Sequence, residues 1–306
     1  MLIYLIVCLL LAILFGGAYY AYRIAFYSPA KDREKIPSTQ GAQYDPYRQE
    51  MKRLFHRLQE RQCEFVTITS HDGLTLSGRY YHTADGAPLD IGFHGYRSSP
   101  MTDFTGGSDL SISLGHNVLL IDHRAHGKSE GRTITFGIKE RRDLLQWVKY
   151  AVERFGENVK IVLYGISMGG ATVLMASELD LPKNVKGIIA DCPYSAPLDI
   201  ILNVGKTMPI PNWLIEPFAK LGARIYGGFD LEETDAKQAV QKTKVPILII
   251  HGEADRLVPC EMSDIISENP DMVTRYTFPN ANHGLSYLED TPRYKQIVVD
   301  FLNQIL

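Results

Sequence analysis

The segment 165–170 constrains the fold of this chain more than any other feature. It reads Gly-Ile-Ser-Met-Gly-Gly, follows the apolar run 160–164, which is typical of a buried strand, and precedes the apolar run 171–176, which is typical of a helix. Glycines on both sides of Ser167 allow backbone segments to approach each other where a side chain would clash. A strand, a sharp turn and a helix are the setting in which G-x-S-x-G forms a nucleophile elbow. We therefore expect Ser167 to stand exposed at the carboxyl end of a strand.

Two further chemically competent side chains follow predicted strands downstream. Asp255 lies in the loop after the apolar run 245–250, and His283 lies in the loop after the predicted strand 274–278. Each residue alone is an ordinary polar loop side chain. The carboxyl ends of parallel strands, however, share one edge of a sheet, so the three residues are expected to meet there. Together Ser167, Asp255 and His283 predict a catalytic triad.

The loop after the predicted strand 89–93 supplies a candidate oxyanion hole. Acyl transfer needs two backbone N–H groups aimed at the developing oxyanion. We expect one from Met168, which follows the nucleophile, and one from Tyr96 in the sequence His94-Gly95-Tyr96. The Tyr96 hydroxyl reaching the oxyanion is a second way in which this residue could act. The alternative is that the His-Gly pair merely ends the strand.

A second motif follows the predicted strand 118–121. With these motifs the chain resembles the α/β-hydrolase superfamily, and most closely the serine esterases and acyl hydrolases that carry H-G-x near the third strand and D-x-R-x-x-G-x-S after the fourth. The resemblance covers roughly residues 63–306. The residues that match the second motif are Asp122, Arg124, Gly127 and Ser129.

The resemblance implies roles for the triad. Ser167 would be the nucleophile, His283 the general base and acid, and Asp255 the acid that orients the imidazole, with neither a metal nor a cofactor required. Many relatives have glycine where this chain has Ala125, and histidine where it has Ile166. Neither departure removes a catalytic group.

The order of predicted elements indicates the fold class. Apolar and polar residues alternate over 64–81, on both sides of the turn His-Asp-Gly at 71–73. This pattern predicts an antiparallel hairpin. From residue 89 onward strands alternate with helices, the strongest helix being predicted at 136–155. This order predicts an α/β-hydrolase fold with a mostly parallel, doubly wound sheet.

The segment of about residues 193–235 is an unusually long and apolar connection between two predicted strands. The resemblance suggests a helical lid insertion over the site, in which Trp213 and Phe218 bind the acyl part of a substrate. The alternative is an ordinary crossover helix packed on the sheet. Such inserted segments set substrate choice, so the physiological substrate and its acyl length cannot be deduced from the motifs.

The N-terminal residues 1–28 predict a membrane anchor. The uncharged run Leu2–Ala21 is about 30 Å long as a helix, which matches the hydrocarbon core of a bilayer. No basic region precedes it, so a single transmembrane helix is favoured over the alternative, a signal peptide. Basic residues follow it and favour a cell-membrane protein whose catalytic domain faces the cytoplasm, although large domains also translocate regardless of charge. These residues are Arg23, Lys31, Arg33 and Lys35.

The remaining composition narrows the function. Residues 29–62 predict a linker and an amphipathic helix over 44–61, before the catalytic domain at 63–306. A net charge of −3 and a pI near 6.3 argue against a nucleic-acid partner. The four cysteines lack metal-site spacing, and Cys192 and Cys260 follow strands at the same edge, which leaves open whether they pair. No obligate protein partner is indicated.

We therefore expect a membrane-anchored serine hydrolase that cleaves a small-molecule or lipid carboxylic ester through an acyl-enzyme on Ser167. A serine peptidase or amidase with the same triad is one alternative. A non-catalytic binding module on the same fold is the other.

Overall fold

The computed structural model describes residues 1–29, 41–268 and 271–306. Within these residues the chain forms one eight-stranded sheet in the order β1-β2-β4-β3-β5-β6-β7-β8. The strands are β1 (Glu64–Thr69), β2 (Thr75–Tyr81), β3 (Leu89–Phe93), β4 (Asn117–Ile121), β5 (Ile161–Ile166), β6 (Val185–Asp191), β7 (Ile247–Gly252) and β8 (Val273–Phe278).

Strand direction confirms the predicted architecture. β1 and β2 form the expected hairpin, in which Glu64 pairs with Tyr80, and β2 also runs antiparallel to β4. The strands from β3 to β8 pair in parallel. Strands β3 to β7 are almost wholly buried, because helices cover both faces of the sheet, and they therefore appear in the sequence as continuous apolar runs.

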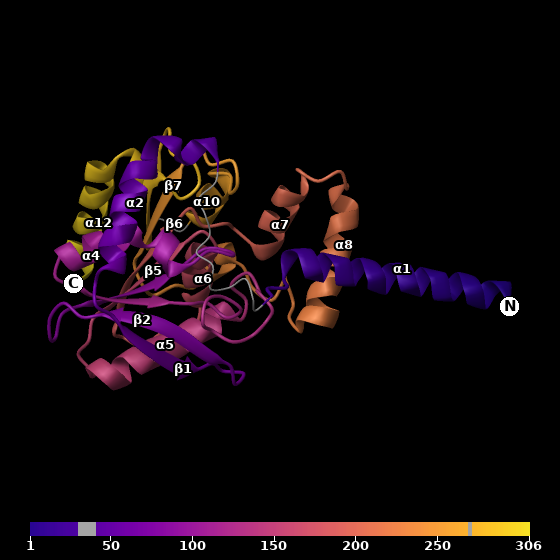
Figure 1. Ribbon diagram of the computed structural model, residues 1–306, viewed down its shortest axis with the longest axis horizontal. Helices are drawn as coiled ribbons and strands as arrows, with labels where there is room; N and C mark the ends of the chain where they lie inside the picture. Colours follow the sequence, from indigo (N-terminus) through magenta and orange to yellow (C-terminus); the bar gives the residue numbers. More distant parts are fainter. Residues whose placement is uncertain (30–40, 269–270) are drawn as a thin grey trace.

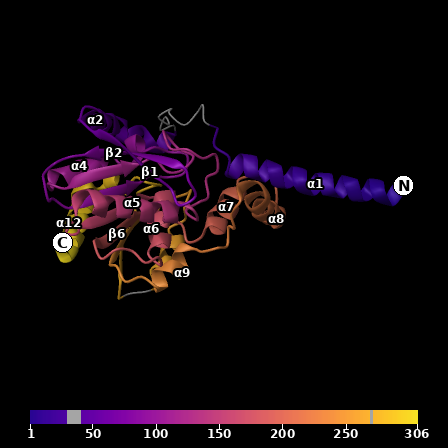
Figure 2. The ribbon, with the colours of Figure 1, turned by 90° about the horizontal axis from the view of Figure 1, so that it is seen from below.

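Two hydrophobic clusters lie on the two faces of the sheet. α2, α4 and α12 lie together on one face, as both ribbon views show (Figures 1 and 2). α5, α6 and α9 pack on the other face. The helices of this unit are α2 (Arg48–Gln59), α3 (Pro100–Asp103), α4 (Thr105–Ser113), α5 (Glu140–Phe155), α6 (Met168–Ala176), α9 (Ala236–Gln241), α10 (Glu261–Ile266), α11 (Ser286–Glu289) and α12 (Thr291–Ile305).

Two helices begin later than the sequence predicts. α5 starts at Glu140 because its carboxylate accepts hydrogen bonds from the N–H groups of Thr135 and Gly137, which holds residues 135–139 in a turn. The predicted helix 44–61 is divided into the 3₁₀ helix η2 (Ala42–Tyr47), which contains Pro46, and α2.

The predicted lid region folds as α7 (Pro197–Gly205), α8 (Asn212–Gly222) and the π-helix η3 (Ala223–Gly227). α1 (Leu2–Ala25) projects away from the sheet, and its C-terminal part packs on α8 and η3 (Figure 1). The helix ends before the predicted boundary at residue 28. Phe26 and Ser28 are instead buried in the α/β unit. The basic residues Lys31, Arg33 and Lys35 lie outside the described residues.

Candidate active site

Ser167 occupies a tight turn between β5 and α6. Its φ of 56° and ψ of −115° form a strained conformation for a residue other than glycine. A Cβ at Gly169 would collide with the carbonyl oxygen of Phe93, and a Cβ at Gly165 would collide with the backbone of Gly169. These collisions explain why the predicted turn needs both glycines.

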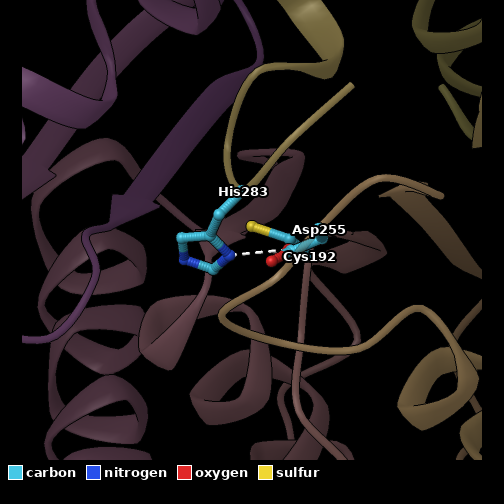
Figure 3. Close-up of side chains that lie close together, drawn as sticks. All are labelled: Cys192, Asp255 and His283. Carbon is cyan, nitrogen blue, oxygen red and sulfur yellow. Dashed lines mark hydrogen bonds and ion pairs between the residues drawn. The ribbon is translucent and has the colours of Figure 1, made fainter. Parts of the chain in front are cut away.

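The structure brings Ser167, Asp255 and His283 together. His283 Nε2 lies 3.0 Å from Ser167 Oγ, and His283 Nδ1 lies 2.7 Å from Asp255 Oδ2. Figure 3 shows the His283 ring pointing toward the Asp255 carboxylate, with the Cys192 thiol beside them. If Nδ1–H donates to Asp255, then Nε2 is free to accept the hydroxyl proton of Ser167.

The charges of this site are set by burial and by partners. Burial alone would raise the pKa of Asp255, but hydrogen bonds from His251 and His283 hold it well below its usual range. Burial would lower the pKa of His283, but the hydrogen bond to Asp255 and its negative charge raise it above the usual value. The arrangement therefore keeps the acid ionised and strengthens the imidazole as a base.

The loop after β3 presents a backbone donor beside Ser167. The N–H of Gly95 donates to Asp103, that of Arg97 to His126 Nε2, and that of Ser98 to the carbonyl of Gly95. Among the described residues, no hydrogen-bond acceptor faces the N–H of Tyr96.

The second expected donor, Met168, is the first residue of α6. It is fully buried, and N–H groups in the first turn of a helix have no intrahelical acceptor. The Tyr96 hydroxyl, in contrast, donates to the carbonyl oxygen of Ala25 over 2.8 Å. It is therefore engaged away from the place where an oxyanion would form, and the backbone is the remaining role of Tyr96.

Two cavities meet at Ser167. One, which we call the apolar cavity, has a volume of about 510 Å³ and lies between α1, α7 and α8. Large aliphatic and aromatic side chains line it. The other holds about 340 Å³ on the side of α2 and α4, and its lining includes Asp103, Asp191 and His283. Both volumes are within the range of small-molecule sites.

Comparison with known proteins identifies the fold that carries this site. Residues 104–225 match the family model described as alpha/beta hydrolase fold. The crystal structure of Pyrococcus furiosus esterase Pf2001 superposes with a TM-score of 0.66 at 23% identity, over 92% of this chain and 97% of that one. The chain has the α/β-hydrolase fold.

Two curated relatives extend over much of this chain. The uncharacterized protein YqkD of Bacillus subtilis is 24% identical over 97% of this chain and 95% of its own length. The thiohydrolase aneE of Aspergillus aculeatus is 26% identical over 78% of this chain and 65% of its own length. Together these similarities support a hydrolase function for the chain.

The two residues expected to bind acyl chains lie in different environments. Phe218 lines the apolar cavity and packs against α1, where a Cβ added to Gly17 would lie 2.5 Å from its ring. Trp213, at the start of α8, is 75% exposed and does not contribute to the lining of that cavity.

The motif after β4 supports the loop that carries Tyr96. His126, within the motif, accepts the hydrogen bond from the N–H of Arg97 over 3.0 Å. Arg124 forms a buried ion pair with Asp143. Ala125 has a φ of 61°, the left-handed conformation that favours glycine, which gives a physical reason for the glycine that the resemblance leads us to expect there.

The sequence analysis did not single out Asp191, which is among the residues that line the cavity on the side of α2 and α4. Its position at the carboxyl end of β6 was the available signal, because functional side chains of parallel sheets gather at that edge. Burial raises its pKa to about 6, despite the hydrogen bond that it accepts from the Tyr294 hydroxyl.

Two groups of side chains with metal-ligand atoms occur among the described residues. The atoms of Cys192, Asp255 and His283 lie within 4.8 Å of one another. Burial raises the pKa of the Cys192 thiol well above its usual value, which disfavours the thiolate that a metal would need. The other set, His71, Asp72 and Asp143, contains the two carboxylates that pair with Arg124. Cys192 and Cys260 are both free thiols.

Proposed function

We propose that this hydrolase is a membrane-anchored serine hydrolase that cleaves a carboxylic ester through an acyl-enzyme on Ser167. The observation that carries the proposal is the hydrogen-bonded chain from Ser167 through His283 to Asp255, with distances of 3.0 and 2.7 Å. These three hydrogen-bonded side chains provide a nucleophile, a base in contact with it, and an acid that orients the base.

The chemistry follows from those positions. His283 takes the hydroxyl proton as Ser167 Oγ attacks the ester carbonyl, and Asp255 stabilises the imidazolium that forms. The N–H groups of Tyr96 and Met168 stabilise the oxyanion of the tetrahedral intermediate. His283 then protonates the leaving alcohol. Water attacks the acyl-enzyme with His283 again acting as base, which releases the acid and restores Ser167.

The two cavities favour an ester over a peptide. The apolar cavity suits an acyl group, because it is lined almost entirely by carbon. The second cavity, on the side of α2 and α4, mixes apolar side chains with the carboxyl-bearing residues Asp103 and Asp191, and it suits an alcohol that has both apolar and hydroxylated parts. A peptidase or amidase with the same triad is the second candidate, and the name of the relative aneE adds thioesters to the substrates that deserve testing.

Exchange of Ser167 for alanine tests the assignment of the nucleophile. We expect Ser167→Ala to lower ester turnover by several powers of ten and to abolish labelling by a fluorophosphonate, with the fold kept. Ser177→Ala is the matched control, because Ser177 ends the same helical segment and its hydroxyl has no partner among the described residues. Labelling that persists in folded Ser167→Ala would exclude Ser167 as the nucleophile.

A matched set of substrates tests the bond that is cleaved. Butyryl groups attached through an ester, a thioester and an amide to similar leaving groups would be compared with the purified full-length protein. We expect the ester to have the highest kcat/KM. A higher value for the amide would favour the peptidase or amidase instead.

The anchor is part of the same proposal. α1 has a mean hydropathy of 2.6 over its most apolar window, only 6% of which is buried, as expected for a helix that contacts lipid. We expect the protein to resist carbonate extraction and the catalytic unit to be cleaved by protease only when the cytoplasmic side is accessible. Extraction by carbonate would contradict the anchor, and protection from protease on that side would contradict the orientation.

A further inference from the structure

The C-terminal part of α1 is packed tightly against the helices of the predicted lid. Ala18 is fully buried, and a Cβ added to Gly222 of α8 would lie 2.6 Å from its carbonyl oxygen. The helices cross where small residues let their backbones come close, a type of contact that is common between membrane helices. The backbones of α1 and α8 are therefore in close contact at this crossing.

The length of α1 brings this crossing to the depth of the bilayer. Residues 2–16, which precede the crossing, rise only about 22 Å, whereas the hydrocarbon core is about 30 Å thick. If α1 crosses the core, residues 17–21 must therefore also lie within it, and any tilt of the helix requires more. Figures 1 and 2 show α7 and α8 as the parts of the catalytic unit farthest along α1 toward its N-terminus.

The apolar cavity continues from Ser167 into this region. Gly17, Tyr20, Ala21 and Ile24 of α1 form one wall, and side chains of α7 and α8 form the opposite one. From Gly17 to Ala25 the cavity follows α1 for about 12 Å. Tyr20 is 61% exposed, so the end of the cavity farthest from Ser167 lies at the surface between α1 and the lid.

The end of α1 is also bound to the loop that carries Tyr96. The Tyr96 hydroxyl donates to the carbonyl of Ala25, and the Arg97 guanidinium donates to the carbonyl of Ile24 over 2.7 Å. Carbonyl groups in the last turn of a helix have no intrahelical donor, so the loop satisfies them. The position of α1 thus fixes one side of the site next to Ser167.

We propose that α1 is a wall of the acyl-binding site as well as an anchor, and that the substrate is a membrane lipid ester whose acyl chain passes from the bilayer into the cavity between α1 and α8. This inference rests on the proposed ester hydrolysis at Ser167. The occupant follows from the position of the cavity, whose outer end lies at hydrocarbon depth, and from its lining, which offers almost no polar group.

Substitutions at Ala21 test this wall. The full-length protein would be reconstituted in phosphatidylcholine vesicles and assayed with p-nitrophenyl butyrate and p-nitrophenyl palmitate. Ala21→Val and Ala21→Phe narrow the cavity by increasing amounts. We expect the ratio of palmitate to butyrate kcat/KM to fall stepwise, by at least tenfold for phenylalanine. Exclusion of one methylene group corresponds to about fourfold, or ~0.8 kcal/mol.

Ala12→Phe is the matched control, because Ala12 is exposed on the same helix and does not line the cavity. It should leave the ratio unchanged. Labelling of Ser167 by a small fluorophosphonate shows which variants fold, and Ala21→Val carries the test if Ala21→Phe is not labelled. An unchanged ratio in labelled Ala21 variants, or an equal fall in Ala12→Phe, would overturn the inference. Absence of both labelling and butyrate turnover in the wild-type protein would instead overturn the proposed function.

A second experiment tests whether the substrate enters the cavity from the bilayer that holds the protein. Dipalmitoylglycerol does not exchange readily between vesicles, so it can be supplied either in the vesicles that hold the protein or in separate ones. We expect turnover only when protein and substrate share a bilayer. Equal rates in the two arrangements would contradict delivery along α1.

Discussion

Asp191 places a second buried carboxyl group beside the proposed general base. Its Oδ2 accepts a hydrogen bond from the Tyr294 hydroxyl over 2.8 Å, whereas its Oδ1 is buried without a partner among the described residues. With its pKa raised to about 6, chiefly by burial, it is ionised at neutral pH. Its charge then contributes, after the larger effect of Asp255, to the raised pKa of His283.

Replacement of Asp191 should therefore alter the pH dependence of the reaction. A general base acts when neutral, so kcat/KM falls as the pH drops below the pKa of His283. Asp191→Asn removes a negative charge, lowers that pKa and should move the acidic limb of the profile to lower pH. The amide oxygen can still accept from Tyr294. Profiles of Asp191→Asn and of the exposed control Asp180→Asn would be compared, and a limb that stays or moves to higher pH contradicts this account.

At the scale of residues, a candidate catalytic side chain can be predicted from the sequence where the neighbouring residues form a recognisable pattern. Ser167 is marked by flanking glycines, and Asp255 and His283 by their positions after strands, and all three lie within hydrogen-bond distance of a neighbour in the triad. The Tyr96 hydroxyl could not be assigned in this way. Its acceptor on Ala25 lies 71 residues away in the chain, and no local pattern indicates such a contact.

At the scale of elements, the segment after α1 belongs to the α/β unit. Phe26 is fully buried, and its ring packs edge-on against Phe136 and Phe229 at centroid distances of 5.7 and 5.3 Å. Its carbonyl accepts from the N–H of Ile134 over 2.8 Å, and Ser28 donates to the carbonyl of Arg132. These contacts attach α1 firmly to the core.

We expect Phe26→Ala to lower the free energy of unfolding by about 3–5 kcal/mol, because it leaves a cavity between two aromatic rings. Phe15→Ala is the control, since Phe15 carries the same side chain but is 43% exposed on α1, the helix that precedes Phe26. Thermal unfolding of both variants in detergent provides the comparison. Equal melting temperatures would show that Phe26 contributes little to the stability of the core.

The strands could be predicted to within about two residues, because burial on both faces of a parallel sheet leaves continuous apolar runs. The start of α5 could not be predicted in this way. It depends on the hydrogen bond from the N–H of Thr135 to the Glu140 carboxylate, which holds the residues before the helix in a turn. The crossing of α1 with α8 was also beyond sequence analysis. Its small residues, Ala18 and Gly222, lie some two hundred positions apart and have no periodic signal in common.

At the scale of the whole molecule, α1 and the predicted lid form one surface. Large apolar side chains are exposed there although the protein has a well-packed core, which is typical of a surface that another apolar phase covers. On the helices and the connecting loop beside α1 these residues are Val204, Met208, Trp213, Ile225 and Tyr226. Trp213 is also of the residue type that is enriched where a membrane meets water.

The two tryptophans of the chain test this placement. Trp213 is 75% exposed on α8, whereas Trp147 is fully buried in the core. In vesicles that contain brominated lipids, we expect the fluorescence of Trp213 to be quenched strongly and that of Trp147 to be unaffected. Trp213→Phe isolates the signal of Trp147 and keeps an aromatic side chain at the membrane surface. Quenching that survives in Trp213→Phe, or equal emission of the wild-type protein in brominated and ordinary lipids, would show that α8 does not touch the bilayer. Such a result would leave ester hydrolysis at Ser167 intact, because the triad lies on the α/β unit, but it would remove the bilayer from the path of the acyl chain.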